Sequence, residues 1–292
     1  MIKKEKEYVT DYTPQEIMAT VIARELQDSH TVFAGIGMPC LGAMLAKYTI
    51  NPALVIVVES GAIAPQPRRI MLSIGDNSCI ERAISTTSLW RVFSDMQRGF
   101  FDVGVIGGAQ VDKWGNVNST VIGSYEKPLV RLPGSGGAND IASSVKKLLI
   151  TIPLEKRRFV EHVDYITSPG YLGPGGPKER RRCGLRGGGP SAVITNKCIF
   201  RFDENGEMYL DAIYPGVKVE DVIKEVQWEL KIAAKLKTVE PPTTEEVEIL
   251  RSLDPLKFYL GDGLQTVDFT SYTKALMYMY ETLKDRINPL LL

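Results

Sequence analysis

The sequence predicts an α/β protein with an open, mostly parallel sheet covered by helices, a small β-hairpin region and a helical C-terminal extension. Short apolar runs typical of strands alternate along the chain with helical patterns, and the loops between them are short. Residues 54–58 form a continuous apolar, largely β-branched run, as in strands buried on both faces of a parallel sheet. Such folds bind ligands outside the carboxyl ends of their strands, so functional residues are expected there.

The N-terminal part of the chain begins with a clear helix signal. Residues 14–26 repeat apolar side chains at helical spacing, Thr13 can act as N-cap and Pro14 fits the first turn. Strand, glycine turn and helix patterns then follow one another. In chain order we expect a strand at 31–34, a glycine turn at 35–39, a helix at 41–47, a strand at 54–58, a helix at 84–97, a strand at 103–106, a loop at 107–118, a glycine turn at 134–138, a helix to 146 and a strand at 148–152.

The composition changes after residue 167. Residues 168–190 are so rich in glycine and proline that a long loop is expected. Pro241 and Pro242 break the chain again, so we assign residues 1–240 to the α/β domain and residues 241–292 to a helical extension. Within these parts we expect strands at 191–195, 198–202 and 208–212, a tight turn at 203–206, and helices at 219–230, 244–253 and 271–287.

Composition excludes several classes of partner. Lys+Arg 35 balance Asp+Glu 35 among 292 residues, so no overall positive field exists to hold nucleic acid or an anionic membrane. The longest apolar uncharged stretch, residues 32–46, is shorter than the about 18 residues that span a bilayer. The N-terminus has no apolar run typical of a secretory signal. We therefore expect a cytoplasmic protein with neither nucleic-acid nor membrane partners.

Cysteine and histidine are too sparse to predict a metal site. The four cysteines form no CxxC pair, and reduced thiols are the expectation. The two histidines, His30 and His162, lie in no catalytic motif. If the chain is an enzyme, carboxylate or backbone groups must carry its reaction.

Glu59 is the leading candidate for such a group. It follows five apolar residues of a predicted strand, where a carboxylate is costly unless it is paired or functional. The alternative is that the strand ends there and Glu59 lies in solvent. Ser60 and Gly61 form a turn that a ligand could approach closely. A glutamate can attack an acyl compound to give a mixed anhydride if preorganised donors, such as backbone amides of a glycine turn, meet the oxyanion.

Two asparagines could support this carboxylate. Asn116 and Asn118 carry side-chain amides, which donate hydrogen bonds without altering the charge. The spacing from Asp112 to Asn116 equally fits an ordinary turn whose polar side chains satisfy each other. Spacing alone leaves both interpretations open.

Six motifs in order resemble one known family. The chain is similar from about residue 13 to about residue 215 to the β subunit of the family I coenzyme A transferases, most closely that of glutaconate CoA-transferase. The motifs are residues 35–39 (GIGMP), 58–61 (VESG), 107–112 (GGAQVD), 115–120 (GNVNST), 134–139 (GSGGAN) and 164–170 (DYITSPG).

The resemblance implies a mechanism and a set of site residues. Glu59 matches the family's catalytic glutamate, which would carry CoA as a glutamyl thioester between an acyl-CoA donor and a carboxylic acid acceptor. Coenzyme A is then a substrate, and no permanently bound cofactor is expected. A separate α-type subunit is implied as partner. By the same resemblance Gly136 and Gly137 would donate to the thioester oxygen, Asn116 would lie near Glu59, and Gly35, Gly37, Ser60 and Gly61 would line the substrate and CoA pocket.

Other functions remain open from sequence. The same scaffold could hydrolyse an acyl-CoA or a cyclic diketone-CoA, with water as final acceptor. A non-catalytic CoA-binding subunit is a further alternative. The basic residues between 178 and 186 could pair with CoA phosphates or with RNA, although a solvated loop fits them as well.

Overall fold

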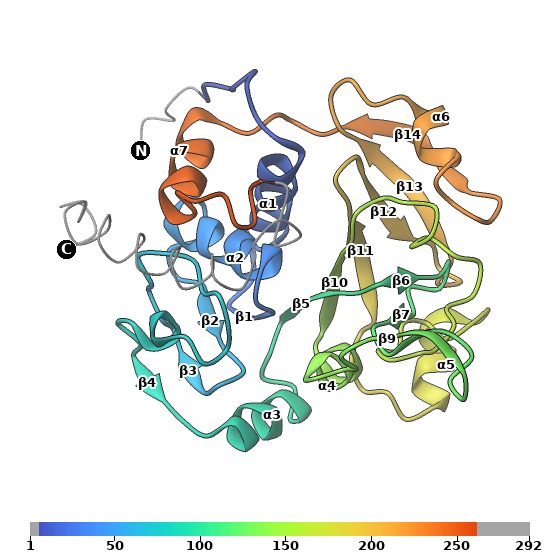
Figure 1. Cartoon of the computed structure of the whole chain (residues 1–292), viewed down its shortest axis with the longest axis horizontal. Coiled ribbons are helices and arrows are strands. Elements are labelled where there is room, and N and C mark those ends of the chain that lie inside the picture. Colours follow the sequence, from blue (N-terminus) through green and yellow to red (C-terminus); the bar gives the residue numbers. More distant parts are fainter. Residues whose placement is uncertain (1–5, 262–292) are drawn as a thin grey trace.

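A single ten-stranded sheet forms the centre of the molecule (Figure 1). The computed structural model describes residues 6–261. The five central strands are parallel, and antiparallel pairs extend the sheet on both sides, which confirms the predicted open, mostly parallel sheet. The strands are, in spatial order, β14 (Lys231–Thr238), β13 (Met208–Ile213), β12 (Cys198–Phe202), β11 (Pro190–Ile194), β10 (Lys147–Thr151), β5 (Val103–Gly107), β1 (Thr31–Ala34), β2 (Val55–Val57), β3 (Ala62–Ile63) and β4 (Ser85–Thr86).

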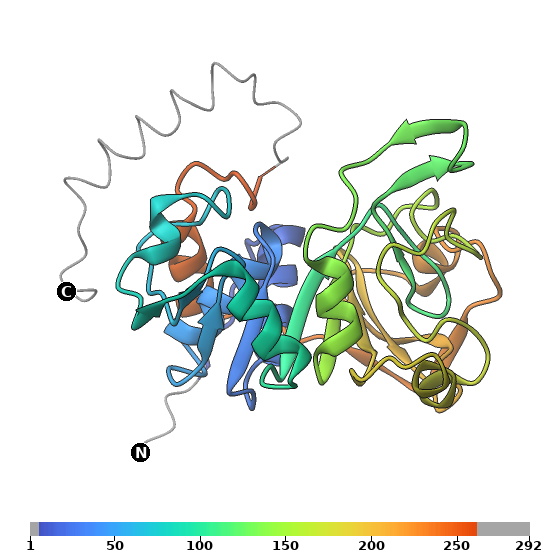
Figure 2. The same ribbon diagram turned by 90° about the horizontal axis from the view of Figure 1, so that it is seen from below.

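Helices cover both faces of this sheet, because its central strands are apolar on both sides. In β1, Val32 and Ala34 point into one core and Phe33 into the other. The first core is covered by α1 (Pro14–Glu25), α2 (Met38–Tyr48) and α7 (Thr244–Leu253), and the second by α3 (Leu89–Gln97), α4 (Ala138–Ser144) and α6 (Val219–Ile223) (Figures 1 and 2). Within residues 6–261 no helix has the length and apolar character needed to cross a bilayer.

Smaller elements extend from the carboxyl edge of the sheet. A two-stranded ladder joins β6 (Gln110–Val111) to β7 (Val117–Asn118), inside the predicted loop. The hairpin of β8 (Val121–Gly123) and β9 (Pro128–Arg131) projects from the body of the protein (Figure 2). The remaining helices are the 3-10 helix η1 (Asn77–Ile80) and α5 (Gly176–Arg182).

The predicted N-cap of α1 is confirmed. The hydroxyl of Thr13 accepts a hydrogen bond from the backbone N–H of Glu16 at 3.1 Å, and the Glu16 carboxylate accepts one from the N–H of Thr13 at 2.7 Å. This capping box satisfies two of the N–H groups that a helix start leaves free. α7 begins with the same device at Thr243 and Glu246. α7 packs into the same core as α1 and α2, and the boundary at residue 240 stays a prediction.

Three predicted elements differ from the structure. The helix expected from 84 starts at Leu89, because residues 85–86 pair with β3 instead. The helix expected at 219–230 ends at Ile223, and residues 231–238 add an edge strand. That strand is mostly exposed and rich in lysine. Lysine side chains at a sheet edge hinder pairing with other chains, but they also remove the alternation of apolar and polar residues by which a strand is predicted. The glycine-rich loop contains α5, whose Arg180 is buried. The helix expected at 271–287 lies outside the described residues.

Candidate active site

Glu59 lies at the tip of a tight turn at the carboxyl edge of the sheet. The chain leaves β2, turns through residues 58–62 and returns as β3. The N–H of Gly61 donates to the carbonyl of Val58 at 2.9 Å, which places Glu59 and Ser60 at the two central positions of the turn. Because β2 runs parallel to β1 and β1 to β5, the turn shares this edge with the residues that follow those strands.

The glycine turn at 134–137 lies directly against the Glu59 carboxyl group. A Cβ atom at Gly137 would stand 3.1 Å from Oε1 of Glu59 and 2.5 Å from Cζ of Phe93. The missing side chain therefore lets carboxylate and backbone come together. Gly136 has φ +48°, and the space beside it is open. The structure thus brings together three predicted residues, Glu59, Gly136 and Gly137.

The two glycine amides offer free hydrogen-bond donors. Within residues 6–261, the N–H groups of Gly136 and Gly137 donate to no protein acceptor, whereas the next amide, of Ala138, donates to the carbonyl of Ser135 at 2.8 Å. Free amides beside a carboxylate can stabilise an oxyanion that develops when that carboxylate forms an acyl bond. The local geometry therefore suits acyl transfer.

The carboxyl group itself is partly buried and unpaired. Glu59 makes no hydrogen bond or ion pair with any other described residue. Burial raises the pKa of Glu59 above its ordinary value. A desolvated carboxylate without a counter-charge is costly for folding, and groups of this kind concentrate at functional sites.

The other predicted pocket glycines have clear structural roles. A Cβ at Gly61, which has φ +112°, would stand 1.8 Å from the carbonyl oxygen of Thr87, so no side chain fits. The N–H of Gly35 donates to Val105 at 3.2 Å and ties the end of β1 to β5. Gly37 has φ +98° at the start of α2, and the ring of Tyr259 lies 3.7 Å from where its Cβ would be. Their part in binding substrate stays a prediction.

Asn116 belongs to a buried network that includes no contact with Glu59. Its Nδ2 donates to Asp112 at 2.9 Å, and its Oδ1 accepts from the backbone N–H groups of Gly170 at 2.9 Å and Leu172 at 3.2 Å. Asn118 is likewise buried and bonds to Gln110 and to the backbone at 120–121. Asn116 thus joins the ladder β6–β7 to residues 170–172, and its predicted role beside Glu59 stays a prediction.

This network predicts the effect of Asn116→Ala. The buried N–H of Gly170, the partly buried N–H of Leu172 and one Asp112 oxygen would lose their partner, and each unsatisfied buried group costs about 1–3 kcal/mol. We expect the free energy of unfolding to fall by about 2–4 kcal/mol in denaturant titrations. Asn205→Ala is the matched control, since Asn205 is exposed and its side chain forms no hydrogen bond in the described structure. A loss at Asn116 no larger than at Asn205 would contradict the structural role.

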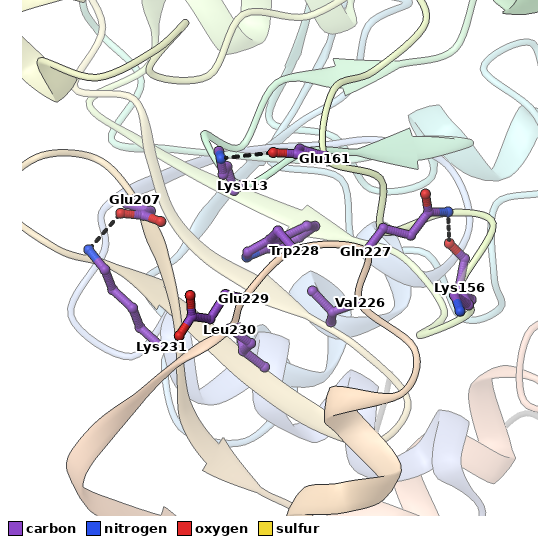
Figure 3. A pocket seen from close by; sticks show the side chains of 10 residues that line it. All are labelled: Lys113, Lys156, Glu161, Glu207, Val226, Gln227, Trp228, Glu229, Leu230 and Lys231. Atoms are coloured by element: carbon purple, nitrogen blue, oxygen red, sulfur yellow. Dashed lines mark hydrogen bonds and ion pairs between the residues drawn. The ribbon is translucent and has the colours of Figure 1, made fainter.

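A large cleft lies elsewhere, beyond β13. It has a volume of about 1020 Å³ (Figure 3). Two ion pairs lie in its lining, Lys113 with Glu161 at 3.4 Å and Lys231 with Glu207 at 2.6 Å. Its lining residues are Lys113, Lys156, Glu161, Glu207, Val226, Gln227, Trp228, Glu229, Leu230 and Lys231. None of the predicted site residues lines it, so this cleft is separate from the predicted site.

One neighbour of Glu59 was not predicted. Phe93 on α3 packs against Gly137 and against Phe33, with 6.0 Å between the two ring centroids. The Phe93 ring and the Glu59 carboxyl group both lie beside Gly137. The position of Phe93 on the apolar side of a helix was visible in the sequence, but that pattern also fits any core residue.

Comparisons with known proteins agree with the family that the six motifs predict. The Coenzyme A transferase family matches residues 15–225. The chain is 42% identical over 245 residues to the B-type subunit of 3-oxoadipate CoA-transferase from Pseudomonas knackmussii, covering 83% of this chain and 94% of that protein. It is 38% identical over 256 residues to the B-type subunit of glutaconate CoA-transferase from Acidaminococcus fermentans, covering 84% and 94%. The crystal structure of glutaconate coenzyme A-transferase from Acidaminococcus fermentans superposes with a TM-score of 0.81 at 36% identity, covering 87% of this chain and 99% of that chain.

The fold and these comparisons therefore define an enzyme of CoA transfer. The chain belongs to the coenzyme A transferase family, which confirms the family that its six motifs predict. Enzymes of this family use coenzyme A as a substrate.

Proposed function

We propose that the chain is the β-type subunit of a heteromeric CoA-transferase that moves CoA from an acyl-CoA to a dicarboxylic acid through a thioester on Glu59. The observation that carries the proposal is the unpaired, partly buried Glu59 carboxylate against Gly137. Two relatives that match over nearly their whole length are themselves named as single subunits of CoA-transferases, which supports an α-type subunit as partner.

The chemistry needs no oxidant, metal or resident cofactor. The Glu59 carboxylate attacks the thioester carbonyl of the donor, and the CoA thiolate leaves, which gives a mixed anhydride. The thiolate then attacks the glutamyl carbonyl and expels the donor as a free carboxylate. The remaining glutamyl thioester reacts with the acceptor carboxylate by the reverse of these two steps. Each step exchanges one anion for another, so the reaction runs without net proton transfer.

The glycine turn suits the demands of these steps. Every addition to a carbonyl places negative charge on an oxygen next to Glu59. We propose that the free amides of Gly136 and Gly137 donate to that oxygen, while Gly35, Gly37, Ser60 and Gly61 shape the surrounding pocket. Coenzyme A serves as substrate only. We propose that the enzyme is located in the cytoplasm, where acyl-CoA compounds and reduced thiols occur together.

The relatives support a proposal for the substrate class. 3-Oxoadipate and glutaconate are both short dicarboxylic acids. We therefore propose a short dicarboxylic acid as acceptor or, in the reverse direction, its CoA ester as donor.

An acceptor-dependence assay tests this function. The chain would be co-expressed with an α-type CoA-transferase subunit and incubated with succinyl-CoA or acetyl-CoA, with or without glutaconate or 3-oxoadipate. We expect chromatography to detect the CoA ester of the added dicarboxylic acid only when that acid is present. Hexanoate, a monocarboxylate, should be a poor acceptor. Release of free CoA at the same rate without any acid would contradict transfer and indicate a hydrolase.

A further inference from the structure

Arg180 is a fully buried cation without an anionic partner among residues 6–261. It is 1% exposed, although it lies in the middle of a glycine- and proline-rich segment. All of its hydrogen bonds within the described structure go to backbone carbonyl groups, and none goes to a carboxylate. A buried charge is tolerated only when its donors are satisfied, and the five N–H groups of arginine in a fixed plane can bridge several backbone segments at once.

These carbonyl groups belong to three separate segments. One guanidinium nitrogen donates to Ala142 in α4 at 2.9 Å, another donates to Pro169 at 2.9 Å and to Gly170, and Nε donates to Gly187 at 3.3 Å. Arg180 thus ties the last turn of α4 to the turn at 169–170. Gly189 leaves room for it, since a Cβ there would stand 2.9 Å from Cδ of Arg180.

A second side chain ties the other end of α4 to the same segment. Nδ2 of Asn139, the second residue of α4, donates to the carbonyl of Thr167 at 2.8 Å. The segment 167–170 is in turn fixed from the far side, because Gly170 donates to Asn116 and residues 167–168 pair with Val117. α4 is therefore attached at both ends to one rigid strip of backbone.

α4 begins directly after the glycine turn that faces Glu59. Gly137 is its N-cap, and any shift of the helix moves the amides of Gly136 and Gly137 relative to the carboxyl group. We propose that Arg180, together with Asn139, is a positioning residue for the reaction: the two side chains form an α4 clamp that holds the glycine turn opposite Glu59. This inference rests on the function proposed above. It gives Arg180 a role that an exposed arginine in a solvated loop would not have.

The test compares Arg180→Met with Arg182→Met in the enzyme assembled with its α-type subunit. Both substitutions remove a cation from α5, but the side chain of Arg182 is 77% exposed and, among the residues that the structure describes, pairs with Glu179 alone. Formation of the Glu59 thioester in a single turnover at saturating acyl-CoA is measured, together with hydrogen exchange of the amides at 134–144. We expect Arg180→Met to slow thioester formation about 10- to 100-fold, as a displacement near 1 Å does, with little change in KM for acyl-CoA and faster exchange in α4. Arg182→Met should match the unsubstituted enzyme.

Three outcomes overturn the inference: an unchanged rate in a folded Arg180→Met enzyme, a slower rate without faster exchange in α4, or an equal loss in Arg182→Met. Should Arg180→Met fail to fold, Asn139→Ala tests the inference instead. Asn139 is at the surface, and removing its side chain releases only one end of the clamp. An unchanged rate and exchange in Asn139→Ala would then overturn the clamp. Absence of any thioester in the unsubstituted enzyme contradicts the proposed function instead, and the exchange comparison still decides whether Arg180 holds α4.

Discussion

Glu59→Gln should abolish CoA transfer while the protein stays folded. The amide that replaces the carboxylate has almost the same size but is a very poor nucleophile, so neither the anhydride nor the thioester can form. Loss of a covalent nucleophile typically lowers kcat by at least about 1000-fold, and we expect a loss of that order in steady-state assays of the assembled enzyme. Glu59→Asp should lose about 100-fold, because the shorter side chain withdraws the carboxylate by about one ångström or more from the glycine turn.

Glu161→Gln is the matched control for this substitution. Glu161 lies in the large cleft beyond β13, so its replacement changes the same charge at a distance from the proposed site. Its activity should equal that of the unsubstituted enzyme. If Glu59→Gln kept more than a tenth of the activity, or if Glu161→Gln lost as much, the reaction could not be centred on Glu59.

The Glu59→Gln variant should be at least as stable as the unsubstituted protein at pH 7. Burial raises the pKa of Glu59 above its ordinary value of 4.5, so between these two values the folded state binds more protons than the unfolded state. The free energy of unfolding contributed by this group therefore falls as pH rises through that window. A neutral glutamine avoids the penalty. A lower midpoint of thermal unfolding for Glu59→Gln would show that the carboxylate stabilises the fold.

Gly137→Ala should give the second largest loss of activity. The added methyl group would stand 2.5 Å from Cζ of Phe93 and 3.1 Å from Oε1 of Glu59, both closer than ordinary contacts. The ring or the carboxyl group must move, and a displaced nucleophile loses about 100-fold in rate. Because the proposed role of the glycine turn is to stabilise the oxyanion of the transition state, kcat should fall much more than KM changes. Steady-state kinetics of the assembled enzyme measure both quantities.

Gly173→Ala separates this contact from the general effect of replacing a loop glycine. A Cβ at Gly173 would meet no atom within 4 Å. We expect unchanged kinetics there. Should Gly137→Ala keep wild-type kcat, the carboxyl group and the glycine turn would not act together.

The sequence predicted most of the central fold because its signals there are local. The run at 54–58 and the capping residue Thr13 gave a strand and a helix start within a residue or two of those observed. Elements at the edges of the sheet were missed. β4 has only two exposed residues, and β14 carries lysines where an alternating strand would show apolar side chains.

For the site, the sequence indicates which residues are candidates but not which of them lie next to each other in the fold. Glu59 and Gly137 are 78 positions apart, and only the folded chain shows that they touch. Arg180 looked like one member of a solvated basic run because nothing local distinguishes it from Arg181 and Arg182. Its burial depends on carbonyl groups at 142, 169, 170 and 187, which the tertiary fold alone assembles.

The most direct measurement of the central claim is the chemical state of Glu59 during turnover. The assembled enzyme would be incubated with acyl-CoA without acceptor, treated with borohydride and digested, and the peptide containing Glu59 analysed by mass spectrometry. A glutamyl thioester is reduced to a primary alcohol, so the account predicts that change on Glu59 and its disappearance when acceptor acid is added before borohydride. An unmodified Glu59 peptide from an enzyme that transfers CoA at its full rate would contradict it.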